Sequence, residues 1–180
     1  MLRAYAANYQ RLENIPGFFT ENTLRFFNDK LSWIVGVRGD NHNQFGFQFT
    51  PRTLLKYDIV PKTIVRGNMG AGWRTVNLFS ENIGSLVSSR DIVFVEQLNP
   101  EQALNYEVNL TQKFETKNNN FSGFLSMDFY RTTFQNQIFP DYDSEPTKAI
   151  IQNFNGTSIS KGFQTEVYMK IYKRFEMKTG

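Results

Sequence analysis

The segment from Leu104 to Phe114 alternates apolar and polar side chains over eleven residues. Its even positions, apart from Gln112, are apolar, and its odd positions are polar. A period of two predicts a β-strand with one apolar face and one polar face. Most strands of soluble proteins have about five or six residues, whereas a tilted strand needs about nine to eleven to cross a bilayer. The length and the pattern together predict a strand of a transmembrane β-barrel, with its apolar face toward lipid.

The composition is compatible with a barrel and excludes several other classes. The chain has 180 residues, enough for one domain, and we treat residues 1–180 as a single partial barrel domain. It contains 18 Phe and 8 Tyr, yet its mean hydropathy is only −0.45, as expected when half of each strand is polar. No run approaches the roughly eighteen apolar residues of a membrane-spanning helix. The scattered basic residues argue against nucleic-acid binding, and the absence of cysteine excludes disulfides and cysteine metal sites.

Seven segments show a two-residue period and are predicted to be strands. They are residues 17–27, 31–38, 48–57, 62–73, 103–115, 120–133 and 159–172. The connections after residues 27, 57 and 114 are short, whereas those after residues 38, 73 and 133, including a polar loop over 39–46, are expected to be long. Alternate connections of an antiparallel meander lie at the same end, so one rim should carry tight turns and the other long loops. We therefore predict an all-β, antiparallel up-and-down meander that forms part of a transmembrane β-barrel, with at most one helical turn over 147–154.

Five motifs resemble, in order and spacing, the barrel of the TonB-dependent outer-membrane receptors. They are Asn14–Glu21, Gly36–Asp40 followed by Thr50–Arg52, Arg66–Arg74, Leu98–Glu107 with its Pro-Glu pair, and Phe154–Gly156 followed by Ser160–Glu166. The resemblance covers roughly residues 14 to 172. Members of this family carry an N-terminal plug domain and a barrel of twenty-two strands. Because about seven strands are predicted here, and residues 1–10 lack the apolar core of a signal peptide, we expect an internal fragment of the C-terminal barrel.

The resemblance implies a transport function rather than an enzymatic one, with no cofactor. It implies a location in the outer membrane of a Gram-negative bacterium, in contact with its lipid, the receptor's own plug domain and the TonB complex. The implied ligand is a scarce small molecule: an iron chelate (siderophore), cobalamin or an oligosaccharide or other glycan. The long connections, residues 75–102 and 134–148, would supply surface at the outer rim.

Six charged residues on the predicted polar faces are candidates for ligand or plug binding. They are Arg52, Arg66, Arg74, Glu107, Asp128 and Glu166. Side chains on the wet face of a barrel can line a substrate path, bind the plug, or simply pair across strands. For any one of the six residues, pairing across strands is the favoured interpretation.

Other motifs have ordinary structural interpretations. Gly67, Gly70 and Gly72 lack the spacing of a phosphate-binding loop and suit a strand that admits close backbone approach. His42 is expected to be a solvated loop residue, and the acidic run from Asp141 to Glu145 an ordinary charged loop. The alternative function is that of a soluble β-sandwich that binds carbohydrate through exposed aromatic residues. A β-rich hydrolase has no supporting pair of acids and no nucleophile arrangement.

Overall fold

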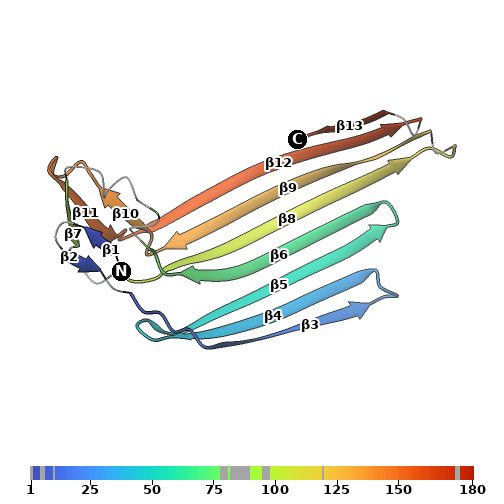
Figure 1. The fold of residues 1–180 in the computed structure, drawn as a ribbon. Coiled ribbons are helices and arrows are strands. Elements are labelled where there is room, and N and C mark those ends of the chain that lie inside the picture. The colour runs from blue at the N-terminus through green and yellow to red at the C-terminus, as the bar shows by residue number, and fades with distance from the viewer. Residues whose placement is uncertain are drawn as a thin grey trace.

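The computed structural model describes residues 2–4, 7–9, 11–77, 81, 90–94, 98–118, 120–172 and 175–180. Its main element is an eight-stranded sheet in the order β13-β12-β9-β8-β6-β5-β4-β3 (Figure 1). All neighbouring strands of this sheet run antiparallel. The strands are β3 (Gly17–Phe26), β4 (Leu31–His42), β5 (Gly46–Val60), β6 (Thr63–Arg74), β8 (Glu101–Glu115), β9 (Phe121–Gln135), β12 (Thr157–Ile171) and β13 (Phe175–Thr179).

Two small sheets lie beyond one end of the large sheet (Figure 1). One is a hairpin of β1 (Leu2–Ala4) and β2 (Ala7–Tyr9). The other contains β10 (Ile138–Asp141), β11 (Lys148–Asn153) and β7 (Asp91–Phe94), with β11 parallel to β7. Segments of the two long connections therefore pair with each other instead of standing apart as separate loops.

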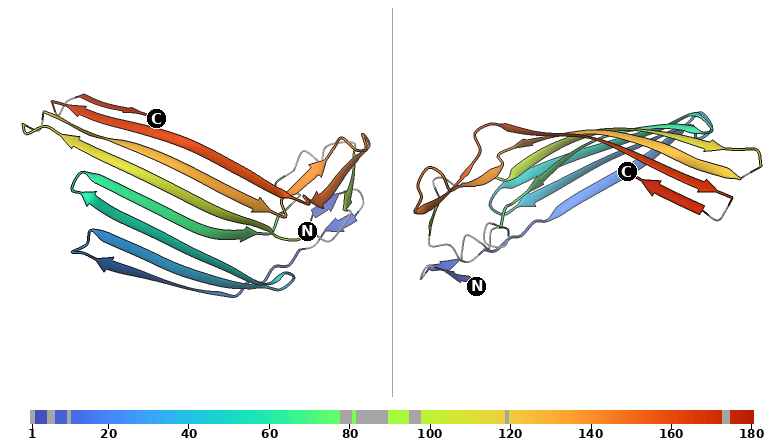
Figure 2. Two further views of the ribbon diagram at one scale, coloured as in Figure 1. Left: turned by 180° about the vertical axis from the view of Figure 1, so that it is seen from behind. Right: turned by 90° about the horizontal axis from the view of Figure 1, so that it is seen from above.

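The large sheet is a single curved layer, and no second layer of described residues covers either of its faces (Figure 2). Among the described residues, the buried hydrophobic side chains are only Ile64, Ala149 and Ile151, and the last two belong to the small sheet. Val108, at the centre of β8, is 55% exposed. A β-sandwich would bury such residues between two sheets, so the structure does not form the alternative soluble fold.

The register of the sheet separates an apolar face from a polar face. Residues directly opposite each other in neighbouring strands share a face. One row across seven strands is apolar except for a single glycine: Leu24, Trp33, Leu55, Gly67, Val108, Phe129 and Phe163. A row of the opposite face is polar except for two glycines: Glu21, Gly36, Arg52, Gly70, Asn105, Thr132 and Ser160. The predicted all-β antiparallel meander with two distinct faces is confirmed.

The predicted polar loop over residues 39–46 is wrong. Residues 39–42 complete β4 and pair with residues 46–49 of β5, leaving a turn of only residues 43–45. The ring of His42 closes this turn, because its Nδ1 accepts the N–H groups of Gln44 at 3.0 Å and Phe45 at 3.3 Å. Only 2% of His42 is exposed, so the prediction of a solvated histidine is also wrong.

The connections at the two ends of the sheet differ in length. At the end that we call the turn end, β3, β5 and β8 are each followed by a short connection. At the opposite loop end, the β4–β5 turn is short, whereas the β6–β8 and β9–β12 connections are long. Two of the three connections expected to be long therefore are. The expected helical turn over residues 147–154 is instead strand β11. Among the described residues, no helix is long and apolar enough to span a bilayer.

Candidate functional site

Three of the six candidate residues, Arg66, Glu107 and Asp128, meet on the polar face of strands β6, β8 and β9. Asn109 connects two of them. Its amide nitrogen donates to Asp128 Oδ1 at 2.6 Å, and its Oδ1 accepts from Arg66 Nη1 at 3.0 Å. Thr111 and Ser126 complete the network: Arg66 Nη1 also donates to Thr111 Oγ1 at 3.2 Å, and Asn109 donates to Ser126 Oγ at 2.7 Å. These side chains share a face because Arg66, Asn109 and Asp128 are directly opposite one another in the register.

A cavity of about 350 Å³ lies over this network. It is lined by all six residues named above together with Leu54 and Asn68. The carboxylate of Glu107 accepts a hydrogen bond from Asn68 Nδ2 at 2.9 Å. Among the described residues, neither Glu107 nor Asp128 forms an ion pair. An amide donates to Glu107, and an amide and a hydroxyl donate to Asp128. The cavity wall thus presents one guanidinium and two carboxylates that keep acceptor capacity for a bound group.

Arg52 lies on the same face but pairs with Glu21, which is two strands away. Gly36 makes this pairing possible, because it stands directly between them in the register. A Cβ atom at position 36 would lie 3.0 Å from Arg52 Nε and 3.5 Å from Glu21 Oε2. The absence of a side chain on β4 therefore lets charges on β3 and β5 meet across it. The ion pair with Glu21 is therefore a structural explanation for a charged residue at position 52.

Arg74 belongs to the loop end, where its Nε donates to Glu101 Oε2 at 2.6 Å and its Nη1 lies 3.4 Å from Glu81. It lines a cavity of about 480 Å³ with residues of β4, β5 and β6. The pairing of β5 with β6 begins at Arg52 and Gly70, so the two strands separate beyond that point. Trp73 lines this cavity as well, and its Nε1 donates to Asp40 Oδ2 at 3.3 Å.

The remaining candidate, Glu166, lies at the far edge of the sheet. Its Oε1 is 3.2 Å from Lys178 Nζ on β13. The structure therefore gathers three candidates in one cavity and places Arg52, Arg74 and Glu166 in separate ion pairs. Their roles in ligand or plug binding stay predictions.

Glu13 anchors the segment before β3 to the loop end, a role that the sequence analysis missed. Its Oε1 accepts hydrogen bonds from Thr75 Oγ1 at 2.9 Å and from His42 Nε2 at 3.2 Å, and it pairs with Arg11. Because His42 Nδ1 accepts two backbone N–H groups, the ring proton must be on Nε2. The Arg11 hydrogen bond, together with those from His42 and Thr75, lowers the pKa of Glu13 below its ordinary value despite partial burial. No sequence motif predicts such a contact, since Glu13 and Thr75 are 62 residues apart.

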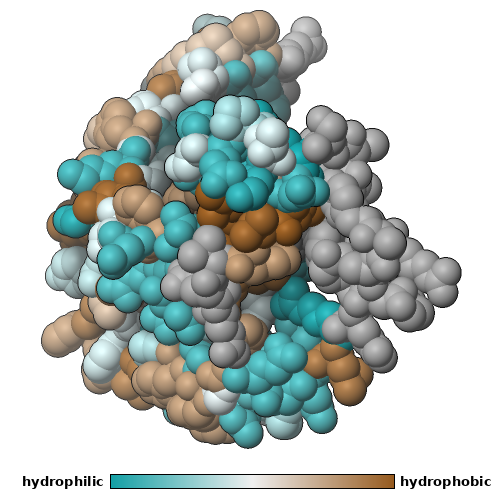
Figure 3. Space-filling view, turned by 90° about the vertical axis from the view of Figure 1, so that its left-hand side faces the viewer, coloured by the Kyte–Doolittle hydropathy of each residue, from teal (hydrophilic) through white to brown (hydrophobic). Residues whose placement is uncertain are grey.

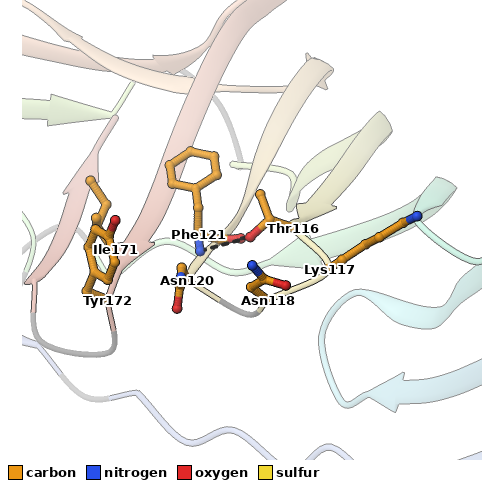
Figure 4. Close-up of a pocket in the computed structure, with 7 residues that line it drawn as sticks. All are labelled: Thr116, Lys117, Asn118, Asn120, Phe121, Ile171 and Tyr172. Atoms are coloured by element: carbon orange, nitrogen blue, oxygen red, sulfur yellow. Dashed lines mark hydrogen bonds between the residues drawn. The ribbon is translucent and has the colours of Figure 1, made fainter.

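A further cavity, of about 490 Å³, opens at the turn end. Figure 4 shows its lining between the β8–β9 turn and the end of β12, with Phe121 beside Thr116, and Ile171 and Tyr172 on the other side. Thr116 Oγ1 accepts the backbone N–H of Phe121 at 3.2 Å, which closes the turn. None of the six candidate residues lines this cavity.

The loop end, viewed directly, presents a mixed surface. Figure 3 shows hydrophobic and hydrophilic residues side by side there. Phe139 and Phe154 contact each other edge to face in this region, with ring centroids 6.2 Å apart. Within the part of the chain that the structure describes, no group of three or more His, Asp or Glu residues is placed to hold a metal ion.

Comparison with known proteins gives a family and a set of structural neighbours. The family model described as TonB dependent receptor-like, beta-barrel matches residues 3–177. The structure is similar to the siderophore receptor PirA from Pseudomonas aeruginosa, with a TM-score of 0.66 and 15% identity over 87% of this chain and 28% of that one. It is also similar to PirA from Acinetobacter baumannii, with a TM-score of 0.64 and 12% identity over 88% of this chain and 26% of that one.

A third neighbour is a variant of the ferric enterobactin receptor PfeA from Pseudomonas aeruginosa in complex with enterobactin. It has a TM-score of 0.65 and 13% identity over 87% of this chain and 24% of that chain. The chain thus spans about a quarter of the length of these receptors. A search of curated protein sequences finds no match.

At such identities the structural likeness establishes the fold alone, and the family model establishes the family. That model matches nearly the whole chain, and the exposed apolar face and hydrogen-bonded polar face are those of a barrel wall. The chain belongs to the TonB-dependent receptor family, as a fragment of its β-barrel domain.

Proposed function

We propose that this segment forms part of the wall of an outer-membrane transporter that imports an iron chelate. The observation that supports it most directly is the single-layer sheet, whose apolar face is exposed and whose polar face carries a hydrogen-bonded network across β6, β8 and β9. Only a closed barrel satisfies the edges of such a sheet in lipid. In the assembled barrel, β3 and β13 pair with strands outside this chain.

The ligand class is proposed from the neighbours. PirA is described as a siderophore receptor, and PfeA is described as a ferric enterobactin receptor in complex with enterobactin. No observation on this chain favours cobalamin or an oligosaccharide over an iron chelate. TonB and the receptor's own plug domain are the partners that the proposal requires, with the plug facing the cavity formed by Arg66, Glu107 and Asp128.

Transport assays on the full-length receptor test the proposal. A strain that lacks the receptor gene is compared with the same strain carrying the gene on a plasmid, each with and without TonB. We expect uptake of radioactive iron from at least one chelate to require both the receptor and TonB. Fractionation should recover the receptor in the outer membrane. The proposal is wrong if iron uptake from every chelate is unchanged while uptake of labelled cobalamin or a labelled oligosaccharide is lost.

The cavity on the polar face has its own test within the same assay. The double variant Arg66→Gln and Asp128→Asn removes two charges but keeps side chains of similar size. We expect it to reduce the uptake rate about tenfold, on the scale of a charged hydrogen bond lost from a binding wall. The double variant Lys170→Gln and Glu176→Gln, which also removes two charges but from an ion pair between β12 and β13 outside the cavity, is the matched control and should leave uptake near the wild-type rate. Equal effects of the two changes would exclude a special role for the cavity.

A further inference from the structure

The apolar face of the eight-stranded sheet carries only two charged side chains, Arg131 on β9 and Lys161 on β12. Every other charged residue of these eight strands, all of which the structure describes, has the register of the polar face. Arg131 shares its face with Val108 and Phe129, and Lys161 shares it with Phe163. Two charged side chains on an otherwise uncharged face of eight strands need a physical explanation.

The two cations are direct neighbours. Arg131 and Lys161 are opposite each other in the pairing of β9 with β12, and both are exposed. Directly opposed side chains of an antiparallel pair have Cβ atoms about 4.5–5.5 Å apart, and like charges in that arrangement repel. Among the described residues, neither side chain has an ion-pair or hydrogen-bond partner. An anion that binds both side chains would convert this repulsion into a bidentate site, with Tyr106 opposite Arg131 on the other side.

The pair lies near the loop end of the apolar face. Arg131 and Lys161 are each four residues from the loop end of their strands. On the turn-end side, the next residues of the same face are Phe129 and Phe163, which are 53% and 67% exposed. Basic residues are costly at the middle of a barrel's lipid face but cost little near the interface, and their long side chains can extend toward the headgroups.

We propose that Arg131 and Lys161 bind the phosphate of a membrane-lipid headgroup in the leaflet at the loop end. The anion is that of a lipid rather than free phosphate, because its site continues directly into exposed aromatic side chains that would contact acyl chains. The inference rests on the proposed membrane location of the apolar face, but it is independent of which ligand the receptor transports.

Native mass spectrometry of the full-length receptor in detergent tests the proposal. The probes are lipid A carrying two phosphates, the same lipid with its phosphates removed, and inorganic phosphate. We expect the phosphorylated lipid to bind the wild-type receptor. The double variant Arg131→Gln and Lys161→Gln should weaken binding roughly 30-fold, given the contribution of each basic residue near an anionic lipid surface. The dephosphorylated lipid should bind the two proteins alike, and inorganic phosphate should not compete.

Two controls separate charge from other effects. The exchanged variant, Arg131→Lys with Lys161→Arg, keeps both charges and should restore binding to near the wild-type level. Lys113→Gln removes a cation from the polar face and should change nothing. Retained gel mobility of the unheated protein shows that each variant is folded.

Other outcomes contradict the proposal in distinguishable ways. Unchanged binding of phosphorylated lipid by the folded double variant would overturn the site while leaving the membrane location intact. Failure of any lipid to bind the wild-type receptor would contradict the lipid-facing surface itself, and with it the proposed function. If the wild-type receptor shows the mass of a dimer and the double variant does not, the pair belongs to a contact between receptor copies instead.

Discussion

Asn109 is the residue on which the polar network depends most. Among the described residues, it is the one side chain that is hydrogen-bonded to both Arg66 and Asp128, and it accepts a further hydrogen bond from Thr111 at 2.9 Å. An amide suits this position because it donates and accepts at the same time. A carboxylate could not donate to Asp128, and an apolar residue could do neither.

Replacement of Asn109 by Ala should therefore destabilise the barrel more than replacement of Asn105. Asn109→Ala removes four side-chain hydrogen bonds at once, at a cost of about 1–3 kcal/mol. Asn105, by contrast, makes a single side-chain bond to Thr132 at 2.9 Å, whose loss costs about 1 kcal/mol. The shift of the urea midpoint of the full-length receptor in vesicles measures both. Equal midpoints for the two variants would contradict the assigned connecting role.

Glu13 gives the second residue-scale prediction, which concerns pH. Its pKa in the folded chain is lowered from 4.5, chiefly by the Arg11 hydrogen bond. A lowered pKa contributes stability that is present above pH 4.5 and is lost as the pH falls through the folded value. The attachment of residues 11–15 to the loop end should thus be intact at neutral pH and loosen below about pH 4.5.

Hydrogen exchange over residues 11–15, corrected for intrinsic rates, measures this loosening between pH 7 and pH 4. Glu13→Gln is the matched control, because it removes the titrating group and should exchange at a similar corrected rate at both pH values. Protection that falls equally in the wild type and in this variant would assign the effect to another group.

At the scale of the strand, Gly123 permits the close approach of β9 and β12. A Cβ atom there would lie 2.0 Å from the backbone oxygen of Tyr168 and 2.8 Å from the ring of Phe114. The backbone oxygen belongs to the paired strand β12 and cannot rotate away, so these strands would have to shift. Overpacking of this kind costs about 1–3 kcal/mol.

Gly123→Ala should accordingly reduce the fraction of receptor that folds, as judged by gel mobility without heating, and lower its unfolding midpoint. Gly72→Ala is the comparison, because a Cβ atom at position 72 has nothing within 4 Å. That variant should fold like the wild type. If both alanines are tolerated equally, the strand spacing around Gly123 is looser than the structure shows.

The whole molecule is organised by the difference between its two faces. Val108 lies at the middle of β8 on the apolar face, and Asn105 lies three residues away on the polar face. A charge on the lipid face near mid-membrane costs about 2–4 kcal/mol, whereas lumen positions tolerate charge. Val108→Arg should therefore impair insertion and stability strongly, and Asn105→Arg only weakly.

Insertion of the full-length receptor into vesicles, followed by urea unfolding, compares the two arginine variants. We expect a larger fraction of the Asn105→Arg variant than of the Val108→Arg variant to insert. A larger loss for Asn105→Arg would reverse the assignment of the faces, and with it the proposed direction of the lumen.

The sequence alone determined seven long strands of the large sheet and their faces, because side-chain alternation is a property of the extended backbone and needs no knowledge of partners. Period and length over residues 104–114 were sufficient to predict a membrane strand with Val108 toward lipid. The charged residues Arg66, Glu107 and Asp128 were assigned to the polar face in the same way, but the sequence did not show that they share a cavity.

Only the tertiary structure decided which side chains meet. The register of β6, β8 and β9 brings together Arg66, Asn109 and Asp128, which are up to 62 residues apart in the chain. The extension of β4 to His42, and the pairing of β11 with β7, depend likewise on partners distant in sequence. Local polarity predicted a loop at residues 39–46, but hydrogen bonds between two strands and a histidine ring made it a continuation of the sheet.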